Sequence, residues 1–169
     1  WDTAQTVTVT GADDDLVDGT VSSTTTLSVI DAASDDNFDA VTDQTVSVST
    51  TDDDVAGFTI VELEGSTSVS EAGSTDTFTV VLDAQPDTNV ILSIISGDTG
   101  EATVTSSLTF TSANWDTAQT VTVTGVDDHL VDGTETSTIT VAVVDVASDD
   151  NFDAVADQTV SVSTTDDDV

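Results

Sequence analysis

Positive charge is missing from this chain: its 169 residues include no Lys and no Arg against 34 Asp and Glu, a formal net charge of -34 at pH 7. Nucleic acids and anionic membrane surfaces are bound through clustered Lys and Arg, so both are excluded as partners. Cysteine is also absent, which excludes a disulfide framework and thiolate metal sites. No apolar run approaches the roughly 20 residues of a membrane span, and we expect a soluble chain without direct membrane insertion.

Apolar residues, in contrast, are plentiful, at 37% of the chain, and many alternate regularly with polar ones. Such a composition favours folding over disorder. Folding, however, brings carboxylates together, and the chain has no Lys or Arg to pair with them. The neutralising charge must therefore come from outside the chain.

An internal repeat organises the sequence. Residues 1–55 recur at 115–169, an offset of 114. The two copies differ at ten positions, 12, 15, 21, 22, 25, 27, 28, 30, 32 and 42. We therefore predict one complete repeat over 56–169, preceded over 1–55 by the C-terminal half of another, and interpret the chain as a window on a longer tandem array.

Period-two alternation with abundant Thr and Val predicts strands throughout the complete repeat, and helical periodicity is absent. The predicted strands are 57–63, 75–83, 89–96, 101–110 with a break at Ser106–Ser107, 117–124, 135–145 and 157–164. Seven short strands separated by Gly, Asp and Asn turns are typical of an all-β, immunoglobulin-like antiparallel β-sandwich. Residues 1–55 should supply only the last three strands of such a sandwich. Three strands with one apolar face uncovered are marginal alone, so we expect the other half to come from upstream sequence or a neighbouring molecule.

Acidic residues concentrate at one end of the predicted sandwich. In an up-and-down reading of the strands, four acidic segments share a pole: Glu71, Asp98 with Glu101, the run 127–135, and 166–168. Converging carboxylates destabilise a fold unless a hard cation takes their oxygens as ligands. Calcium suits such a set, because it accepts about 6 to 8 oxygens in flexible geometry, whereas magnesium tends to keep its waters.

A plainer interpretation of each acidic run is a turn or a solvated loop, since Asp side chains accept hydrogen bonds from nearby backbone N–H groups. One run alone leaves the two interpretations even, and four runs at one pole favour a metal. The EF-hand pattern does not account for them: Gly133 as its central glycine would place Leu130 at a ligand position and Ile139 where the bidentate Glu belongs.

The order of these motifs resembles the Calx-beta domain: Ser70-Glu71-Ala72-Gly73, then Gly97-Asp98, then Val123-Thr124-Gly125-Val126-Asp127-Asp128 with Asp132 and Glu135, and last Thr165-Asp166-Asp167-Asp168. That family includes the calcium-sensing domains of sodium/calcium exchangers and tandem modules of large bacterial surface proteins. The resemblance covers residues 56–169. It implies calcium ligands at Glu71, Asp98, Asp127, Asp128, Asp132, Glu135, Asp166, Asp167 and Asp168, with the Leu130 carbonyl as a backbone ligand.

The partial repeat matches the same motifs at Asp13, Asp14, Asp18, Asp52, Asp53 and Asp54. Val21 stands there in place of Glu135, and no counterpart of Glu71 or Asp98 precedes it. The resemblance therefore implies a weaker half-site in residues 1–55, or one completed by another segment.

Catalytic residues are scarce, and we expect no enzyme. His129 is the only imidazole, and Asp15 takes its place in the other copy, which favours a loop residue over a catalytic base. Paired carboxylates suit glycoside hydrolysis, but here they belong to the predicted cation site. Trp1 and Trp115 are interpreted as aromatics that cap the core. Phe38 and Phe152 should anchor their acidic loops or an interdomain contact, with a ligand-binding tip as the alternative.

These observations together predict a calcium-binding structural repeat of an extracellular, cell-surface or secreted matrix protein, acting as a spacer or filament element in a bacterial adhesin. Its partners would be adjacent repeats or neighbouring copies in a fibre. The short linker Val55-Ala56-Gly57 leaves little freedom, and calcium bound beside it would stiffen the joint. A calcium sensor and a ligand-binding adhesion module remain the alternatives.

Overall fold

The computed structural model describes residues 2–169 as two compact units, one of residues 2–14 and 18–53 and the other of residues 15–17 and 54–169. Trp1, interpreted above as a core-capping residue, lies outside the described residues. Over the described range no helix is long and apolar enough to cross a membrane.

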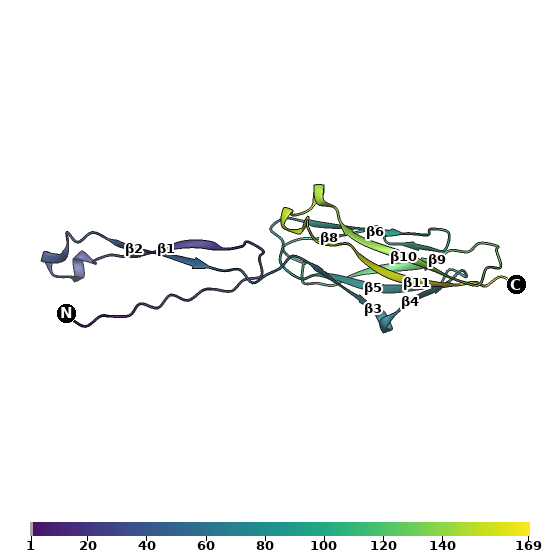
Figure 1. Cartoon of the computed structure of the whole chain (residues 1–169), viewed down its shortest axis with the longest axis horizontal. Coiled ribbons are helices and arrows are strands. Elements are labelled where there is room, and N and C mark those ends of the chain that lie inside the picture. Colours follow the sequence, from purple (N-terminus) through teal and green to yellow (C-terminus); the bar gives the residue numbers. More distant parts are fainter. Residues whose placement is uncertain (1) are drawn as a thin grey trace. The chain divides into compact units, whose positions relative to one another are not determined.

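The second unit is a sandwich of two β-sheets (Figure 1). The five-stranded sheet has the order β4-β11-β10-β6-β8, and the four-stranded sheet has the order β3-β5-β9-β7. The strands are β3 (Phe58–Glu62), β4 (Thr67–Ser70), β5 (Thr75–Leu82), β6 (Val90–Ser96), β7 (Ala102–Val104), β8 (Ser107–Phe110), β9 (Gln119–Gly125), β10 (Thr134–Val143) and β11 (Gln158–Thr165). All neighbours pair antiparallel except β4 and β11, which are parallel.

Alternating side chains from the two sheets fill the space between them. Phe78 and Val80 of β5 and Leu92 of β6 are fully buried, and the residues that alternate with them, such as Thr79 and Ser93, are partly exposed on the outer faces. Burial of the inward row and solvation of the outward row are what period-two alternation produces in a sandwich. The prediction of an all-β immunoglobulin-like sandwich is confirmed, and Trp115 packs against its core as predicted.

One predicted strand is divided between the two sheets, and one strand of the structure was not predicted. The strand predicted over 57–63 corresponds to β3, and the structure adds a separate strand, β4, that pairs with β11 in the other sheet. Strand β4 was not predicted because its few residues follow the turn η3 (Leu63–Gly65), where Glu64 adopts φ of 59°. The predicted break in the fourth strand is confirmed near Ser106, where the chain passes from β7 to β8.

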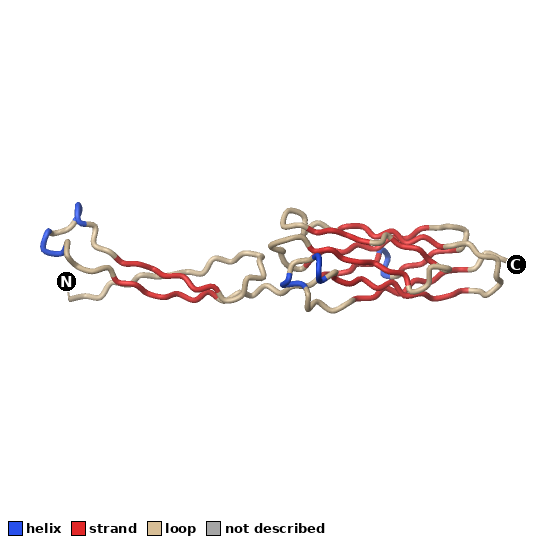
Figure 2. Tube along the Cα trace, turned by 90° about the horizontal axis from the view of Figure 1, so that it is seen from above, coloured by secondary structure: helices blue, strands red, loops and turns tan. Residues whose placement is uncertain are grey.

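Short 3-10 turns occupy the loops before β2 and β11 (Figure 2). They are η1 (Asp31–Ala33), η2 (Asp36–Phe38), η4 (Asp145–Ala147) and η5 (Asp150–Phe152). In the second unit Asp149 is buried and accepts hydrogen bonds from the backbone of Thr88 and Asn151. Phe152 is fully buried there and anchors its loop to the sandwich core as predicted, whereas Phe38 is 58% exposed and does not anchor its loop in the first unit.

The first unit contains one two-stranded antiparallel sheet, β1 (Val21–Leu27) with β2 (Gln44–Thr50). The prediction of a third strand before β1 is wrong, because residues 3–14 form no strand. The corresponding strand of the second unit, β9, pairs with β5 and β7. Residues 1–55 contain no counterpart of β5 or β7, the two strands that flank β9 in the second unit.

Gly125 ends β9 beside Ser70, the last residue of β4. A Cβ atom at Gly125 would overlap the Ser70 carbonyl oxygen, whereas a Cβ atom at the equivalent Gly11 would lie 3.4 Å from the nearest atom, a Thr50 methyl group. We expect Gly125→Ala to destabilise the second unit by about 1 to 3 kcal/mol, through the same crowding as an overpacked core.

The measurement is urea unfolding followed by Trp115 fluorescence in a Trp1→Phe background. Gly11→Ala is the matched control and should leave this transition unchanged. Equal stability of the two variants would contradict the tight approach of β9 to β4.

Candidate metal site

Glu71 lies in the turn between β4 and β5, and its side chain is buried, with 1% of its surface exposed. Its backbone N–H donates to the carbonyl of Thr165, 3.1 Å away, at the end of β11. The parallel pairing of β4 with β11 thus holds Glu71 beside the segment 166–168. Its Oε2 atom is buried without a hydrogen-bond partner, an arrangement that costs free energy unless something else satisfies the oxygen.

Asp166 connects this segment to the loop between β9 and β10. Its carboxylate accepts hydrogen bonds from the backbone N–H groups of Gly133, at 2.9 Å, and Asp168, at 2.7 Å. Gly133 adopts φ of 83°, a left-handed conformation that glycine takes without strain. The loop that carries Asp128 and Asp132 is therefore tied directly to the end of β11.

Glu101 enters the cluster from the turn between β6 and β7. Its carbonyl accepts a hydrogen bond of 2.9 Å from the backbone of Val126, which attaches this turn to the start of the β9–β10 loop. The Glu101 side chain is half-buried, and its Oε2 atom is buried without a partner. Asp98 has a different local role: its exposed carboxylate accepts from the Gly100 N–H at 2.9 Å, as in an Asx turn.

Carboxylates from all four acidic segments meet at this end of the sandwich. Among the described residues, four groups have potential ligand atoms within 4.8 Å of one another. These groups are Glu71 with Asp128 and Asp168, Glu71 with Asp132 and Asp166, Glu101 with Asp128 and Asp132, and Asp127 with His129 and Asp168. We call their members the carboxylate cluster. Because the groups share members, they form one connected site.

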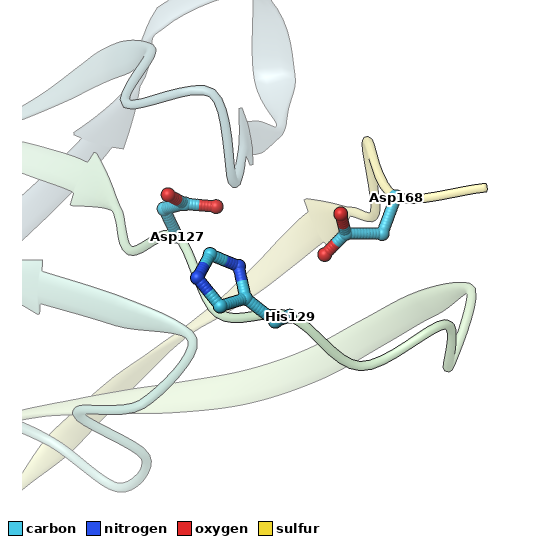
Figure 3. Close-up of side chains that lie close together, drawn as sticks. All are labelled: Asp127, His129 and Asp168. Atoms are coloured by element: carbon cyan, nitrogen blue, oxygen red, sulfur yellow. The ribbon is translucent and has the colours of Figure 1, made fainter.

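The outer part of the carboxylate cluster includes the only histidine (Figure 3). His129 and Asp127 are exposed, and Asp168 is half-buried. At the sequence level His129 was interpreted as a loop residue, which its position in the β9–β10 loop agrees with. The sequence placed the run 127–135 and the segment 166–168 at one pole, and the pairing of β10 with β11 brings His129 close to Asp168, but His129 was not among the predicted ligands.

Burial and mutual repulsion raise the pKa of two carboxyl groups in this cluster. The pKa of Glu71 is raised by burial first, then by the charges of Asp166 and Asp128. Burial also raises the pKa of Glu101, and Asp132 and Asp98 raise it further. By contrast, hydrogen bonds from backbone N–H groups, first from Gly133, lower the pKa of Asp166. The cluster therefore holds unfavourable negative charge beside a carboxylate fixed in its ionised form.

Not every predicted ligand enters the cluster. Within the part of the chain that the structure describes, Asp98, Glu135 and Asp167 belong to no such group, nor do the predicted ligands of the partial repeat, Asp13, Asp14, Asp18, Asp52, Asp53 and Asp54. Glu101, named among the acidic residues of this pole but absent from the ligands implied by the resemblance, does belong. Its position directly before strand β7, at the acidic pole, is the sequence feature that could have identified Glu101 as a candidate ligand. The ligand assignment of each residue stays a prediction.

A metal cation fits the carboxylate cluster on two independent grounds. The donors are carboxylate oxygens, with one imidazole at the rim, and oxygens are the ligands that hard cations prefer. In addition, the buried oxygens of Glu71, Glu101 and Asp168 have no hydrogen-bond donor. With no Lys or Arg in the chain, these oxygens point to a ligand from outside it.

No family model and no curated protein matches the chain. Among solved structures it is similar to the E. coli chaperone DraB, at 10% identity over 67% of this chain and 58% of that one, with a TM-score of 0.46. Domains 4 and 5 of the S-layer protein SbsC are 23% identical over 72% of this chain and 52% of theirs, with a TM-score of 0.42. The apo form of the Calx CBD1 domain is 16% identical over 66% of this chain and 98% of its own, with a TM-score of 0.45.

The carboxylate cluster gives the metal-free protein a specific pH dependence. The folded-state pKa of Glu71 and Glu101 lies above the ordinary 4.5, so the folded chain binds these protons more tightly than the unfolded chain does. In chelator, the melting temperature of the second unit should therefore rise as the pH falls from neutral through these raised values. The lowered pKa of Asp166 makes the melting temperature fall as the pH falls, but only at pH values below the ordinary pKa of 3.8.

Glu71→Gln should raise the melting temperature in chelator at neutral pH, because it removes the buried charge, and should flatten the pH dependence. Glu64→Gln is the control, since Glu64 is exposed in η3. This account would be contradicted by a melting temperature that falls steadily as the pH is lowered from neutral in chelator. Equal melting temperatures of Glu71→Gln and the parent chain would also contradict it.

Proposed function

We propose that the second unit is a calcium-binding structural repeat. The observation that carries this proposal is the buried Glu71 carboxylate, which has one oxygen without a hydrogen-bond donor and faces further carboxylates in a chain devoid of Lys and Arg. Calcium accepts about 6 to 8 oxygen ligands in flexible geometry, which suits carboxylates contributed by four separate segments. Magnesium requires near-ideal octahedral geometry and retains its waters, so it fits this set less well.

The residues that would hold calcium are those of the carboxylate cluster: Glu71, Glu101, Asp127, Asp128, Asp132, Asp166 and Asp168. Asp98, Glu135 and Asp167 are further ligands implied by the resemblance to Calx-beta domains. Bound calcium would supply positive charge that offsets the repulsion among these residues, and it would link the turns that carry them. The cation would thereby stabilise one end of the sandwich.

The biological setting that we propose is an extracellular fibre or stalk, at the cell surface or in a secreted matrix. Two segments identical at all but ten of 55 positions suit an element that acts by repetition. Adjacent repeats, or neighbouring copies in a fibre, would be the partners, and calcium would limit the freedom between repeats. In this setting the site would bind calcium at about 10⁻⁴ to 10⁻³ M, the range of extracellular calcium modules.

Calcium titration of the full chain tests the site. We expect saturation near 10⁻⁴ to 10⁻³ M in calorimetry and a higher melting temperature in calcium than in chelator. Glu71→Gln should weaken calcium binding by about tenfold or more, because affinity depends on ligand charge. Glu64→Gln should bind as the parent chain does.

An unchanged melting temperature in calcium and chelator would refute the metal site. Saturation at micromolar calcium would instead favour the sensor alternative, since sensors bind at about 10⁻⁷ to 10⁻⁵ M.

The role as a stiffening element requires a separate measurement, because a site can bind calcium without restricting the chain. Small-angle scattering of two complete repeats, residues 56–169 joined head to tail, should show a larger and more narrowly distributed radius of gyration in calcium than in chelator, because only a complete repeat brings Glu71 and Glu101 to the acidic segment 166–168 that precedes the joint. Insertion of Gly and Ser residues between the two copies is the control, and should reduce the difference. Equal radii in the two conditions would leave calcium binding intact but exclude the stiffening role.

A further inference from the structure

The repeated sequence occurs in two different environments. Val7 and Val46 of the first unit are 64% and 53% exposed, whereas the equivalent Val121 and Val160 of the second unit are 0% and 2% exposed. The local sequences around these positions are nearly identical. The difference therefore lies in what covers them, and the first unit presents an apolar face to solvent.

The second unit shows which segment provides the cover. Residues 115–169 form β9, β10 and β11, and every remaining strand of the sandwich comes from residues 56–114. We call residues 56–114 the covering segment. Its strands β5 and β7 flank β9, its strand β4 pairs with β11, and Phe78 and Leu92 fill the core.

A hollow in the first unit lies at the position that β4 takes in the second. It has a volume of about 400 Å³ and is lined by residues of 9–13 and 48–53. In the second unit, the equivalents of residues 48–51 are residues 162–165, which pair with Thr67–Ser70 of β4. The equivalent of Gly11 is Gly125, against which the Ser70 carbonyl packs. The walls of the hollow are thus the two elements that hold β4.

We propose that the first unit is an acceptor for a second copy of the covering segment, seated with its β4 strand in this hollow and parallel to β2. The 169 residues contain two acceptor sequences, 1–55 and 115–169, but one covering segment, and residues 115–169 already use it. A polypeptide with the pattern of residues 56–114 is therefore the occupant that fits the apolar face, the hollow and residues 3–13, which form no strand. This proposal does not depend on calcium binding.

The test joins a second copy of residues 56–114 to the N-terminus of the full chain. Asn114 of the added copy then precedes Trp1, which reproduces the natural Asn114–Trp115 junction. Hydrogen exchange measured by NMR in chelator should become at least about tenfold slower at the amides of residues 5–11 and 48–51, since both segments gain strand partners. Binding of an apolar dye should fall at the same time.

The matched control carries Val69→Asp and Phe78→Asp in the added copy alone. It should leave the amides of residues 5–11 and 48–51 as fast as in the unmodified chain, while the amides of 119–125 remain protected and show that the second unit is folded. Unchanged exchange in the parent fusion would overturn the proposal. The proposal would also be overturned if these amides in the unmodified chain became more protected at higher protein concentration. The apolar face of one copy would then be covered by the same face of another copy.

Discussion

Closure of one β-sheet over the other is the interaction on which the rest of the structure depends. In the second unit the five-stranded and four-stranded sheets bury each other's apolar rows, and this closure also brings the turns after β4, β6, β9 and β11 to one end. Residues 2–53 repeat nearly the same sequence without that closure. There the hairpin of β1 and β2 forms, but residues 3–13 form no strand, and among the residues described no group of three possible metal ligands lies in this unit. Local sequence is enough for a hairpin, whereas the carboxylate cluster requires the complete sandwich.

Electrostatics opposes this closure. Bringing Glu71 and Glu101 into contact with Asp128 and Asp132 concentrates negative charge, and burial penalises the charged form further. In most proteins Lys or Arg would offset such a concentration, but this chain contains neither. The packing of the two sheets that buries Phe78 therefore also brings the carboxylates close together. The folded second unit thus carries an electrostatic cost that no Lys or Arg side chain of the protein offsets.

Much of this architecture could be predicted from the sequence, because the apolar rows alternate cleanly and each strand ends at a turn residue. The strands from 75 to 83 and 89 to 96 agree with β5 and β6 to within a residue at each end. Strand β4 could not be predicted, since four residues after a turn carry too little periodicity, and its pairing with β11 joins segments distant in sequence. The strand expected before β1 failed for a related reason: alternation indicates which residues suit a strand, but not whether a partner is present. Glu101 shows the same limit in the site, because its place beside Asp128 depends on how two turns meet.

One hydrogen bond is common to both units. Asp52 accepts from the Gly19 N–H at 2.7 Å, as Asp166 does from Gly133 at 2.9 Å, so the loop and the terminal acidic segment are already connected in the first unit. The part of the acidic pole that lies in residues 1–55 is thus already held together by its own hydrogen bond, whereas Glu71 and Glu101 belong to the covering segment. A cation that needs ligands from both segments would bind only where an acceptor sequence and a covering segment have folded together. In a tandem array, ion binding would then act as a check on correct assembly, distinguishing paired repeats from mispaired ones.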